Sequence, residues 1–438
     1  MQEHFYGLAD YLTGQLHADE VLLLNYGGEE SDFVRFSKSL IRQAGAVDQK
    51  GMSLELIKGK RHARVTLGLA GSESQDRPAS LDALVRARDM LRDIPEDPYL
   101  LYSTEVHSGQ QHGENRLPRT GQAVEEILKQ GAGRDLVGIH AQGGIFAGFA
   151  NSLGQRNWFS SHSFHFDWTF YHRTDKAVKS SYAGFEWDAA AFEAKVATAR
   201  TQLEALAQEP RTIPRGEYRV YMTPAAFAEF VRMIGWGGYG LKAHRTKGTC
   251  LLKMQAGAML SPSVNIAENT KEGIAPNFQS AGFLKPDRVS LIAAGKLDQM
   301  LVSPRSAREY GASPNADEHE APESLDMAGG EIESADALAK LGTGVYINTL
   351  WYLNYSDRPA CRITGMTRFA TFWVENGRVV APLNVMRFDE TAYRVLGENL
   401  LGLTRERDFI PSSSTYQGRS TSSARLPGAL VDKFAFTL

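Results

Sequence analysis

Cysteine is scarce in this chain, which has only Cys250 and Cys361 among its 438 residues. Two thiols far apart in sequence cannot form the disulfide framework of a small secreted domain, so they favour a reducing compartment. The sequence also lacks a run of about 20 apolar residues that could cross a bilayer, and its first residues lack the basic and apolar segments of a secretory signal. We therefore expect a cytoplasmic protein that has no membrane partner.

The chain has no large excess of either charge, with 48 basic and 51 acidic residues and a formal net charge of −3. A protein that follows the phosphate backbone of nucleic acid usually needs a basic surface, so nucleic acid is not expected as a partner. Hydrophobic residues make up 42% of the chain, which is an ordinary globular content. At this length two domains are the default expectation.

Helical spacing of apolar residues appears twice near the start of the chain. Residues 5–16 are predicted to form an amphipathic helix. Ser31 or Asp32 could cap a second helix, which would end at Gly45. The buried face of this second helix would be formed by Phe33, Phe36, Leu40 and Ala44.

Strand patterns dominate the next part of the chain. Alternating apolar residues predict a β-hairpin over residues 54–67. Residues 136–182 have the pattern of a β-meander, with one apolar face that is formed by Phe164, Phe166, Trp168 and Phe170. A long helix capped by Asp188 follows, and Pro210 and Pro214 then break the chain, so we place the domain boundary there.

The second half of the sequence is richer in strands. Residues 217–222 are predicted to form a strand and residues 224–234 a short helix. Two hairpins are predicted, over residues 289–302 and 371–381, and the second turns at Asn376 and Gly377, the strongest two-residue turn signal.

These patterns predict an α+β fold with two domains. Residues 1–209 would form an N-terminal domain of mixed helices and antiparallel sheet. Residues 212–438 would form a β-rich C-terminal domain.

Ser163, His165 and Asp167 have the residue types of a nucleophilic triad. They alternate on one predicted strand face, however, whereas a nucleophile usually sits on a sharp turn and receives its base from another element. No Gly-x-Ser-x-Gly motif occurs in the sequence. We therefore expect these three residues to form a solvated strand face.

Three groups of residues could ligate a metal: His107 and His112 with Glu105 and Glu114, residues 317–320, and His244 with Cys250 and Cys361. The spacing of the first two histidines matches no compact zinc signature and favours a polar surface loop. The acidic run 317–320 is typical of a solvated surface. Imidazole and thiolates suit zinc in the third group, but lone cysteines more often occupy the core.

The glycine-dense residues 235–240 could bend backbone amides around a phosphate. They lack the Gly-Lys-Ser/Thr ending of a P-loop and do not lie between a strand and a following helix. A helix end with a tight turn explains them better. The residues considered alone therefore define no active site.

Several segments of the second half resemble the TldD/PmbA family, also called the modulator-of-gyrase family. The resemblance extends over about residues 212–385, and the order and spacing of its segments carry it. These segments are residues 214–222, 289–311, 344–350, 363–368 and 372–377. The resemblance to the family implies a two-domain architecture and a role in proteolysis.

The resemblance also implies where a metal would bind. The TldD branch of the family resembles a zinc peptidase that carries His-Glu-x-x-x-His on a helix soon after a Gly-Glu-Tyr strand. In this chain the corresponding positions hold Arg232, Met233 and Gly237, and no histidine lies between His172 and His244. The chain is therefore similar to the TldE (PmbA) branch, which lacks the motif and pairs with a TldD subunit.

We interpret the chain as a non-catalytic subunit of a heteromeric metallopeptidase that degrades or matures unfolded peptides. No metal is expected on this chain, and zinc is expected in the TldD-like partner. If an extended peptide binds by strand addition, the candidate peptide-facing residues are Thr364, Gly365, Met366, Thr367 and Arg368. A structural strand and turn is an equally good interpretation of this segment.

Two other functions stay open. The chain could be a stand-alone regulatory or binding protein of the gyrase-modulator type, with no proteolytic partner. It could also be an independent enzyme that holds zinc on His244, Cys250 and Cys361.

Overall fold

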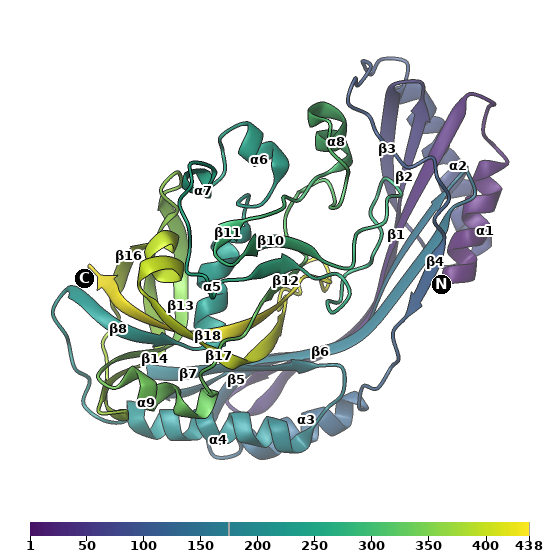
Figure 1. The fold of residues 1–438 in the computed structure, drawn as a ribbon. Coiled ribbons are helices and arrows are strands. Elements are labelled where there is room, and N and C mark those ends of the chain that lie inside the picture. Colours follow the sequence, from purple (N-terminus) through teal and green to yellow (C-terminus); the bar gives the residue numbers. More distant parts are fainter. Residues whose placement is uncertain (174–175, 438) are drawn as a thin grey trace.

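The computed structural model describes residues 1–173 and 176–437. An antiparallel sheet dominates the first half, in the strand order β3-β2-β1-β5-β6-β4, and β7 also pairs with β6 (Figure 1). Among the described strands of this sheet, the short β4 alone pairs parallel to its neighbour. The strands are β1 (Glu20–Ser37), β2 (Leu40–Lys58), β3 (Arg61–Gly68), β4 (Gly109–His112), β5 (Asp135–Asn151), β6 (Arg156–Arg173) and β7 (Lys176–Gly184).

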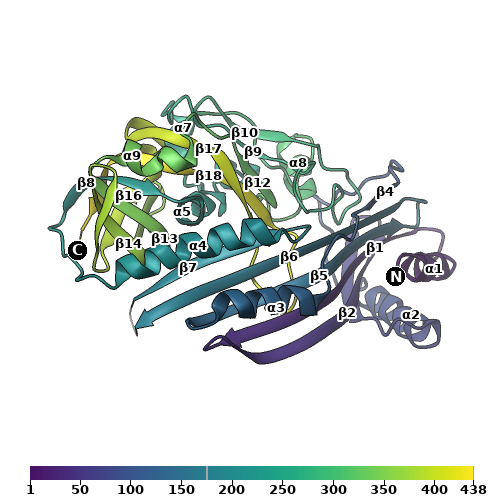
Figure 2. The ribbon, with the colours of Figure 1, turned by 90° about the horizontal axis from the view of Figure 1, so that it is seen from below.

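Four helices of the first half cover this sheet: α1 (Gln2–Thr13), α2 (Glu73–Met90), α3 (Thr120–Gly131) and α4 (Ala189–Leu206). Helices α3 and α4 lie across one face, whereas α1 and α2 pack at the other end (Figure 2). The predicted first helix is confirmed, and Asp188 caps α4 by accepting hydrogen bonds from two backbone N–H groups. No helix in the described part of the chain is long and apolar enough to cross a membrane.

A larger sheet occupies the second half, in the order β11-β10-β9-β12-β18-β16-β14-β13-β8. A further pairing of β18 with β8 closes the last five of these strands into a ring. The strands are β8 (Gly216–Met222), β9 (Ile266–Glu268), β10 (Val289–Ala293), β11 (Lys296–Leu297), β12 (Ser324–Met327), β13 (Gly344–Asp357), β14 (Arg362–Glu375), β15 (Arg378–Pro382), β16 (Arg387–Thr391), β17 (Leu400–Pro411) and β18 (Ser423–Phe436).

Helix α5 (Pro224–Gly235) is the most deeply buried helix of the second half. It packs against β13 and β18, and its apolar residues belong to the main core of this half. Thr223 caps it, and Pro224 occupies the first turn, where a missing N–H costs nothing. The other helical segments are short: α6 (Leu241–Arg245), α7 (Leu252–Gln255), α8 (Pro304–Tyr310), α9 (Ala337–Leu341), a 3-10 turn at Ser334–Asp336 and a π turn at Arg394–Glu398.

One hydrophobic cluster joins the two sheets. It combines aromatic residues of β6 with the apolar stripe of α4, and it includes Ala370 and Phe372 of β14. Trp168 and Phe192 of this cluster are almost completely buried. The two halves therefore share apolar core, and their relative position is fixed by packing rather than by surface contacts alone.

The α+β fold class is confirmed, with mixed helix and antiparallel sheet in the first half and a β-rich second half. The hairpin β2–β3 is confirmed, as is the hairpin β14–β15. In the β14–β15 hairpin, the turn residues Asn376 and Gly377 both have positive φ, as a two-residue Asn-Gly turn requires.

The predicted helix between Ser31 and Gly45 is wrong. These residues form the long hairpin β1–β2, which turns at Lys38 and Ser39, both with positive φ. Strand β1 pairs with β2 on one side and with β5 on the other. The ladders on both sides satisfy its backbone polar groups, so this distant pairing overrides the helical spacing of the apolar residues.

Residues 412–422, between β17 and β18, form a strap that crosses the face of the N-terminal sheet. Its anchor is Arg419, whose guanidinium donates to Ser31 Oγ (3.3 Å), to the Gly143 carbonyl (3.1 Å) and to Ser163 Oγ (2.7 Å). The Arg419 backbone N–H donates to Glu29 Oε2 at 3.0 Å. Burial lowers the pKa of Arg419 to about 10. The strap thus ties the C-terminal part of the chain to the first sheet.

Arg419→Ala should lower the free energy of unfolding by about 3 kcal/mol, because buried acceptors on β5 and β6 would lose a charged donor. Urea denaturation followed by far-UV circular dichroism measures this change. Arg378→Ala is the matched control, since Arg378 is exposed at the start of β15, and it should change stability by less than about 0.5 kcal/mol. Equal effects of the two variants would show that the strap is not anchored through Arg419.

Candidate functional site: a cleft beside the end of helix α5

A cleft of about 620 Å³ lies where the N-terminal sheet faces loops of the second half. One wall is formed by Glu55 of β2 and by His62 and Arg64 of β3, together with the loop after α2. The other wall contains residues 280–281, 303–306 and 318–320 and the segment after α5. Gly237 and Gly240 line the cleft, so it opens directly beside the C-terminal end of that helix.

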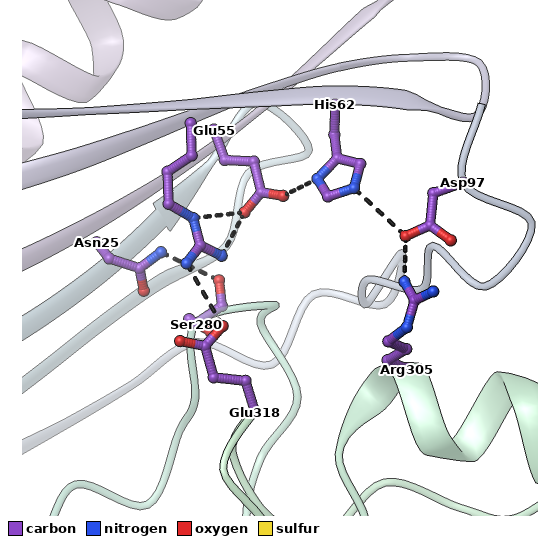
Figure 3. Close-up of polar contacts among 8 residues, drawn as sticks. Asn25, Glu55, His62, Asp97, Ser280, Arg305 and Glu318 are labelled. Carbon is purple, nitrogen blue, oxygen red and sulfur yellow. Dashed lines mark hydrogen bonds and ion pairs between the residues drawn. The ribbon is translucent and has the colours of Figure 1, made fainter. Parts of the chain in front are cut away.

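A series of five ionisable groups runs along the cleft (Figure 3). Glu55 Oε1 lies 2.7 Å from His62 Nδ1, and His62 Nε2 lies 3.5 Å from Asp97 Oδ2. Arg305 of α8 donates to the same oxygen of Asp97. On its other side, Glu55 Oε2 accepts a hydrogen bond of 2.8 Å from Arg64 Nη2.

This series of charged contacts shifts the pKa values of the groups in it. The hydrogen bond to Glu55 is the main reason that the pKa of His62 is raised. Burial alone would raise the pKa of Glu55, but the hydrogen bonds from His62 and Arg64 outweigh it and the pKa is lowered. The pKa of Asp97 is lowered in the same way, because a backbone N–H and Arg305 outweigh its burial. Glu55 and Asp97 therefore favour the charged form of His62.

Several contacts bridge the cleft from one half of the chain to the other. They include the Arg305–Asp97 pair, a pair between Arg64 Nη1 and Glu318 Oε2 at 3.5 Å, and a hydrogen bond of 3.1 Å from Asn25 Nδ2 to the Ser280 carbonyl (Figure 3). These bridges hold the walls at a fixed separation. The cleft therefore offers charged and amide groups for binding.

The motif positions on α5 and just beyond its end lack the side chains of a zinc site. Arg232 donates through Nη2 to the Ile410 carbonyl at 2.8 Å, and the Met233 carbonyl accepts a hydrogen bond from Tyr355. Gly237 has φ +76°, and a Cβ there would lie 2.6 Å from Arg358 Nη2. A shift of one residue puts Val231, Arg232 and Trp236 at these positions, which supply no imidazole or carboxylate either. The residues present therefore do not fit a zinc ion.

His244 does not join the two cysteines. Its Nε2 atom lies 2.7 Å from the Gly238 carbonyl and its Nδ1 atom lies 2.9 Å from Gln255 Nε2, so both ring nitrogens are engaged. Cys250 and Cys361 are buried, unlinked and in contact with each other inside the core. No group of three or more His, Cys, Asp or Glu side chains in the described ranges is arranged to hold a metal.

The predicted solvated face of β6 is wrong. Ser163 and His165 are only 2% and 3% exposed, because the strap lies over them, whereas Asp167 is half-buried. Burial and the charge of Arg419 lower the pKa of His165 to about 4, and burial lowers the pKa of His140 to about 4 as well. Ser163 Oγ is occupied by Arg419. Ser163 therefore anchors the strap, and the structure shows no hydrogen bond that joins the described residues Ser163, His165 and Asp167 as a triad.

The remaining sequence candidates are ordinary turns and surface groups, with one exception. Residues 105–115 are exposed, as expected for a polar surface segment, but Gly109–His112 form the short strand β4 and not a loop. Residues 235–240 end α5 in a tight turn, where the Gly238 N–H donates to the Ile234 carbonyl. The exception is Glu320, which was expected in solvent but is buried, because it accepts hydrogen bonds from Ser303 and from the backbone N–H of Lys242.

The candidate peptide-facing segment, residues 364–368, lies inside β14. Its neighbours β13 and β16 pair with it from both sides, so its backbone is not open to strand addition. Thr364, Met366 and Arg368 are half-buried, whereas Gly365 and Thr367 point into the core. None of these residues lines the cleft. A peptide could reach this segment only through its half-buried side chains.

Sequence reasoning missed the residues that build the cleft. Glu55, His62 and Arg64 lie on one hairpin, where Glu55 is directly opposite Arg64. Their opposite charges across the predicted Gly59-Lys60 turn were a usable signal for a cross-strand pair. Asp97, Arg305 and Glu318 had no such signal, because only the folded chain brings them to the hairpin.

The two sheets, the shared core and the cleft define an α+β protein of two β-sheet halves. A family model described as the PmbA/TldA metallopeptidase C-terminal domain matches residues 215–438, more than half of the chain. The chain belongs to the TldD/PmbA family.

Solved structures share this fold over the whole chain. A candidate modulator of DNA gyrase from Thermotoga maritima has a TM-score of 0.79, with 13% identity and coverage of 100% of both chains. TldE from Thermococcus kodakarensis has a TM-score of 0.77 and 14% identity over 99% of this chain and 100% of its own. A candidate modulator of DNA gyrase from Bacteroides thetaiotaomicron has a TM-score of 0.74 and 15% identity, over 99% of this chain and 98% of its own. Comparison with curated proteins gives no match.

Acid should destabilise the protein through His165. Its pKa of about 4 in the folded chain lies below the ordinary value of 6.5, so the unfolded chain binds the proton first and stability falls between pH 6.5 and 4. The loss from pH 7 to pH 5 should be about 2 kcal/mol for this group. Urea denaturation at both pH values should show a smaller loss for His165→Gln. His172→Gln, exposed at the end of the same strand, is the control and should keep the wild-type pH dependence.

His62 should titrate above the usual range for histidine, because Glu55 and Asp97 stabilise its charged form. The stability that this interaction contributes is fully present below pH 6.5 and is lost as the pH rises through the raised pKa. A histidine NMR titration measures the pKa directly. Asp97→Asn should lower it, whereas Asp93→Asn, which removes an exposed carboxylate nearby, should not. A His62 pKa that is the same in both variants would show that Asp97 does not act on His62.

Proposed function

We propose that this chain is a non-catalytic, TldE/PmbA-like subunit of a heteromeric TldD/TldE-type metallopeptidase that degrades or matures unfolded peptides. The observation that carries the proposal is the combination of the family's metallopeptidase domain with a helix α5 that offers no metal ligand. Zinc would be held by a TldD-like partner and would activate water there. This chain would act in the cytoplasm, in keeping with its two unlinked thiols.

The role of this chain would be to hold the substrate. The cleft has charged groups and backbone amides on both walls, which suit the repeating N–H and C=O groups of an extended peptide. Exposed Lys242 makes no ion pair within the described residues and lies in the cleft wall, where it could receive a peptide carboxylate. Thr364, Met366 and Arg368 would contribute side-chain contacts outside the cleft.

The end of α5 also suits contact with a partner. Trp236 is 65% exposed, and Arg358 holds the loop by donating to the Trp236 carbonyl at 2.6 Å and to the Gly248 carbonyl at 3.0 Å. Exposed aromatic residues supported by arginine are typical of interface centres. A partner seated here would lie against the mouth of the cleft.

A second candidate function is a stand-alone regulator. Two of the structural neighbours are described as candidate modulators of DNA gyrase, and a regulator of that type would need no peptidase partner. The net charge of −3 gives no electrostatic support for a DNA-bound role. Gel filtration of the chain with gyrase and with a TldD-like subunit separates the two candidates by which of them co-elutes.

Co-expression with a TldD-like subunit should give a complex that holds stoichiometric zinc and cleaves an unfolded peptide. The isolated chain should do neither, because its α5 supplies no ligand. Zinc analysis and cleavage of a fluorogenic peptide are measured on the complex and on each half. Zinc-dependent cleavage by this chain alone would contradict the non-catalytic role.

The same complex tests the cleft. Thr246→Trp fills part of it, and it should raise KM severalfold with little change in kcat, because it blocks binding and not chemistry. Thr201→Trp, on the exposed face of α4, is the matched control and should change neither constant. An unchanged KM for Thr246→Trp would place the peptide elsewhere.

A further inference from the structure

Strand β2 has a long open edge (Figure 2). Strand β3 covers only Gly51–Lys58 of β2, so the preceding residues 40–50 pair with β1 on one side and with no strand in the described part of the chain on the other. Residues 40–46 are all exposed. An edge of this length exposes unpaired N–H and C=O groups that favour pairing with another chain.

The usual protection against such pairing is weak at this edge. Residues 43–47 carry no charge and are small or neutral, namely Gln43, Ala44, Gly45, Ala46 and Val47. Leu40 and Ile41, beside the hairpin turn, are 68% and 49% exposed. Natural edges are usually guarded by lysine, proline or a covering element, and residues 43–47 have none of these.

The direction of the backbone groups shows which residues can pair. The Lys50 carbonyl accepts a hydrogen bond from the Leu69 N–H on the β3 side. Because alternate residues of a strand point their N–H and C=O groups to the same side, Ala44, Ala46 and Asp48 also point away from β1. These residues can form an antiparallel ladder with a second strand without disturbing β1.

The edge is complementary to itself in one register. If two copies pair antiparallel about Gly45, Ala44 lies opposite Ala46 and Arg42 lies opposite Asp48, twice across the symmetry axis. Asp48 is exposed and pairs with Lys50 of its own strand, so Arg42 of the second copy would join that pair. Arg42 is exposed, makes no ion pair with any described residue and lies at the bulge beside Phe36, where it has no partner on β1. Pairing about Ala44 would place Arg42 opposite the uncharged Ala46. Pairing about Ala46 would place Arg42 opposite Lys50, which has the same charge.

We propose that residues 40–50 of β2 form a symmetric antiparallel interface with the same residues of a second copy of this chain, centred on Gly45. The ladder between Ala44 and Ala46 supplies the main-chain hydrogen bonds, and the two Arg42–Asp48 pairs select the register. Leu40 and Ile41 of each copy would then lie against Lys50 and Gln49 of the other. The interface is independent of the proposed peptidase function.

Charge exchange tests the register. Analytical ultracentrifugation of the full chain should show a dimer, and Arg42→Glu or Asp48→Arg should each weaken it at least tenfold by placing like charges opposite each other. The double variant should dimerise again. An equimolar mixture of the two single variants should also form dimers, because the introduced carboxylate then faces the introduced guanidinium, and Asp48 of one copy faces Arg42 of the other. Failure of this rescue would overturn the proposed register.

A backbone change tests the ladder itself. Ala46→Pro removes an outward N–H and leaves the bonds to β1, so it should give a monomer with a normal circular dichroism spectrum. Ala44→Ser, exposed on the same strand, is the control and should remain dimeric. A monomeric wild-type chain, or a dimer unaffected by Ala46→Pro, would overturn the proposal. Binding of an extended peptide to a monomeric wild-type chain at this edge would identify a peptide as the occupant and would equally overturn it.

Discussion

The packing of β6 and α4 against β14 is the contact on which the rest of the structure depends. Trp168 and Phe192 bring the first sheet and its long helix together, and Phe372 extends this cluster into the second sheet. Closely packed aromatic residues resist small displacements because each shift creates voids. The two halves are therefore fixed at one end of the molecule, and the cleft lies where their loops meet away from this cluster.

The strap and the cleft bridges extend this arrangement with polar contacts. Arg419 joins residues far apart in sequence by donating to β5 and β6, and Arg305 and Arg64 join the halves across the cleft. The two kinds of contact differ in burial. The Arg419 guanidinium is deeply buried, so its loss leaves acceptors unsatisfied, whereas the cleft arginines remain about half exposed and their pairs are screened by water. The strap therefore stabilises the fold, whereas the contacts across the cleft mainly set the geometry of the cleft.

Much of the fold could be predicted from local sequence, because the signals for α1, α4, α5 and the Asn376-Gly377 hairpin are local in origin. A capping Asp188, a proline at the first turn of α5 and an Asn-Gly pair each act within a few residues. The β1–β2 hairpin could not be predicted this way. Phe33, Phe36 and Leu40 fit a helix by spacing, and only pairing with β5, about a hundred residues later, decides for a strand.

The candidate site was less predictable for the same reason. The missing ligands on α5 were visible in the sequence, since an arginine, a methionine and a glycine have no metal-binding group there. The cleft was not visible, because Asp97, Arg305 and Glu318 look like ordinary surface charges until the fold brings them to the β2–β3 hairpin. Likewise, Ser163 and His165 have the alternation of an exposed face, but both are buried, and Arg419 of the strap binds Ser163.

The residues that α5 carries have a consequence for the helix itself. A metal-binding helix must keep two imidazoles and a carboxylate in a polar site, which opposes burial. Here the same helix is free to bury Phe227, Phe230 and Ile234, while Arg232 and the end of the helix are fixed by the Ile410 carbonyl, Tyr355 and Arg358. Packing and these hydrogen bonds hold the helix in place, so its end forms a rigid support beside the cleft. A rigid support is what a subunit needs if it positions a substrate for a reaction that its partner performs.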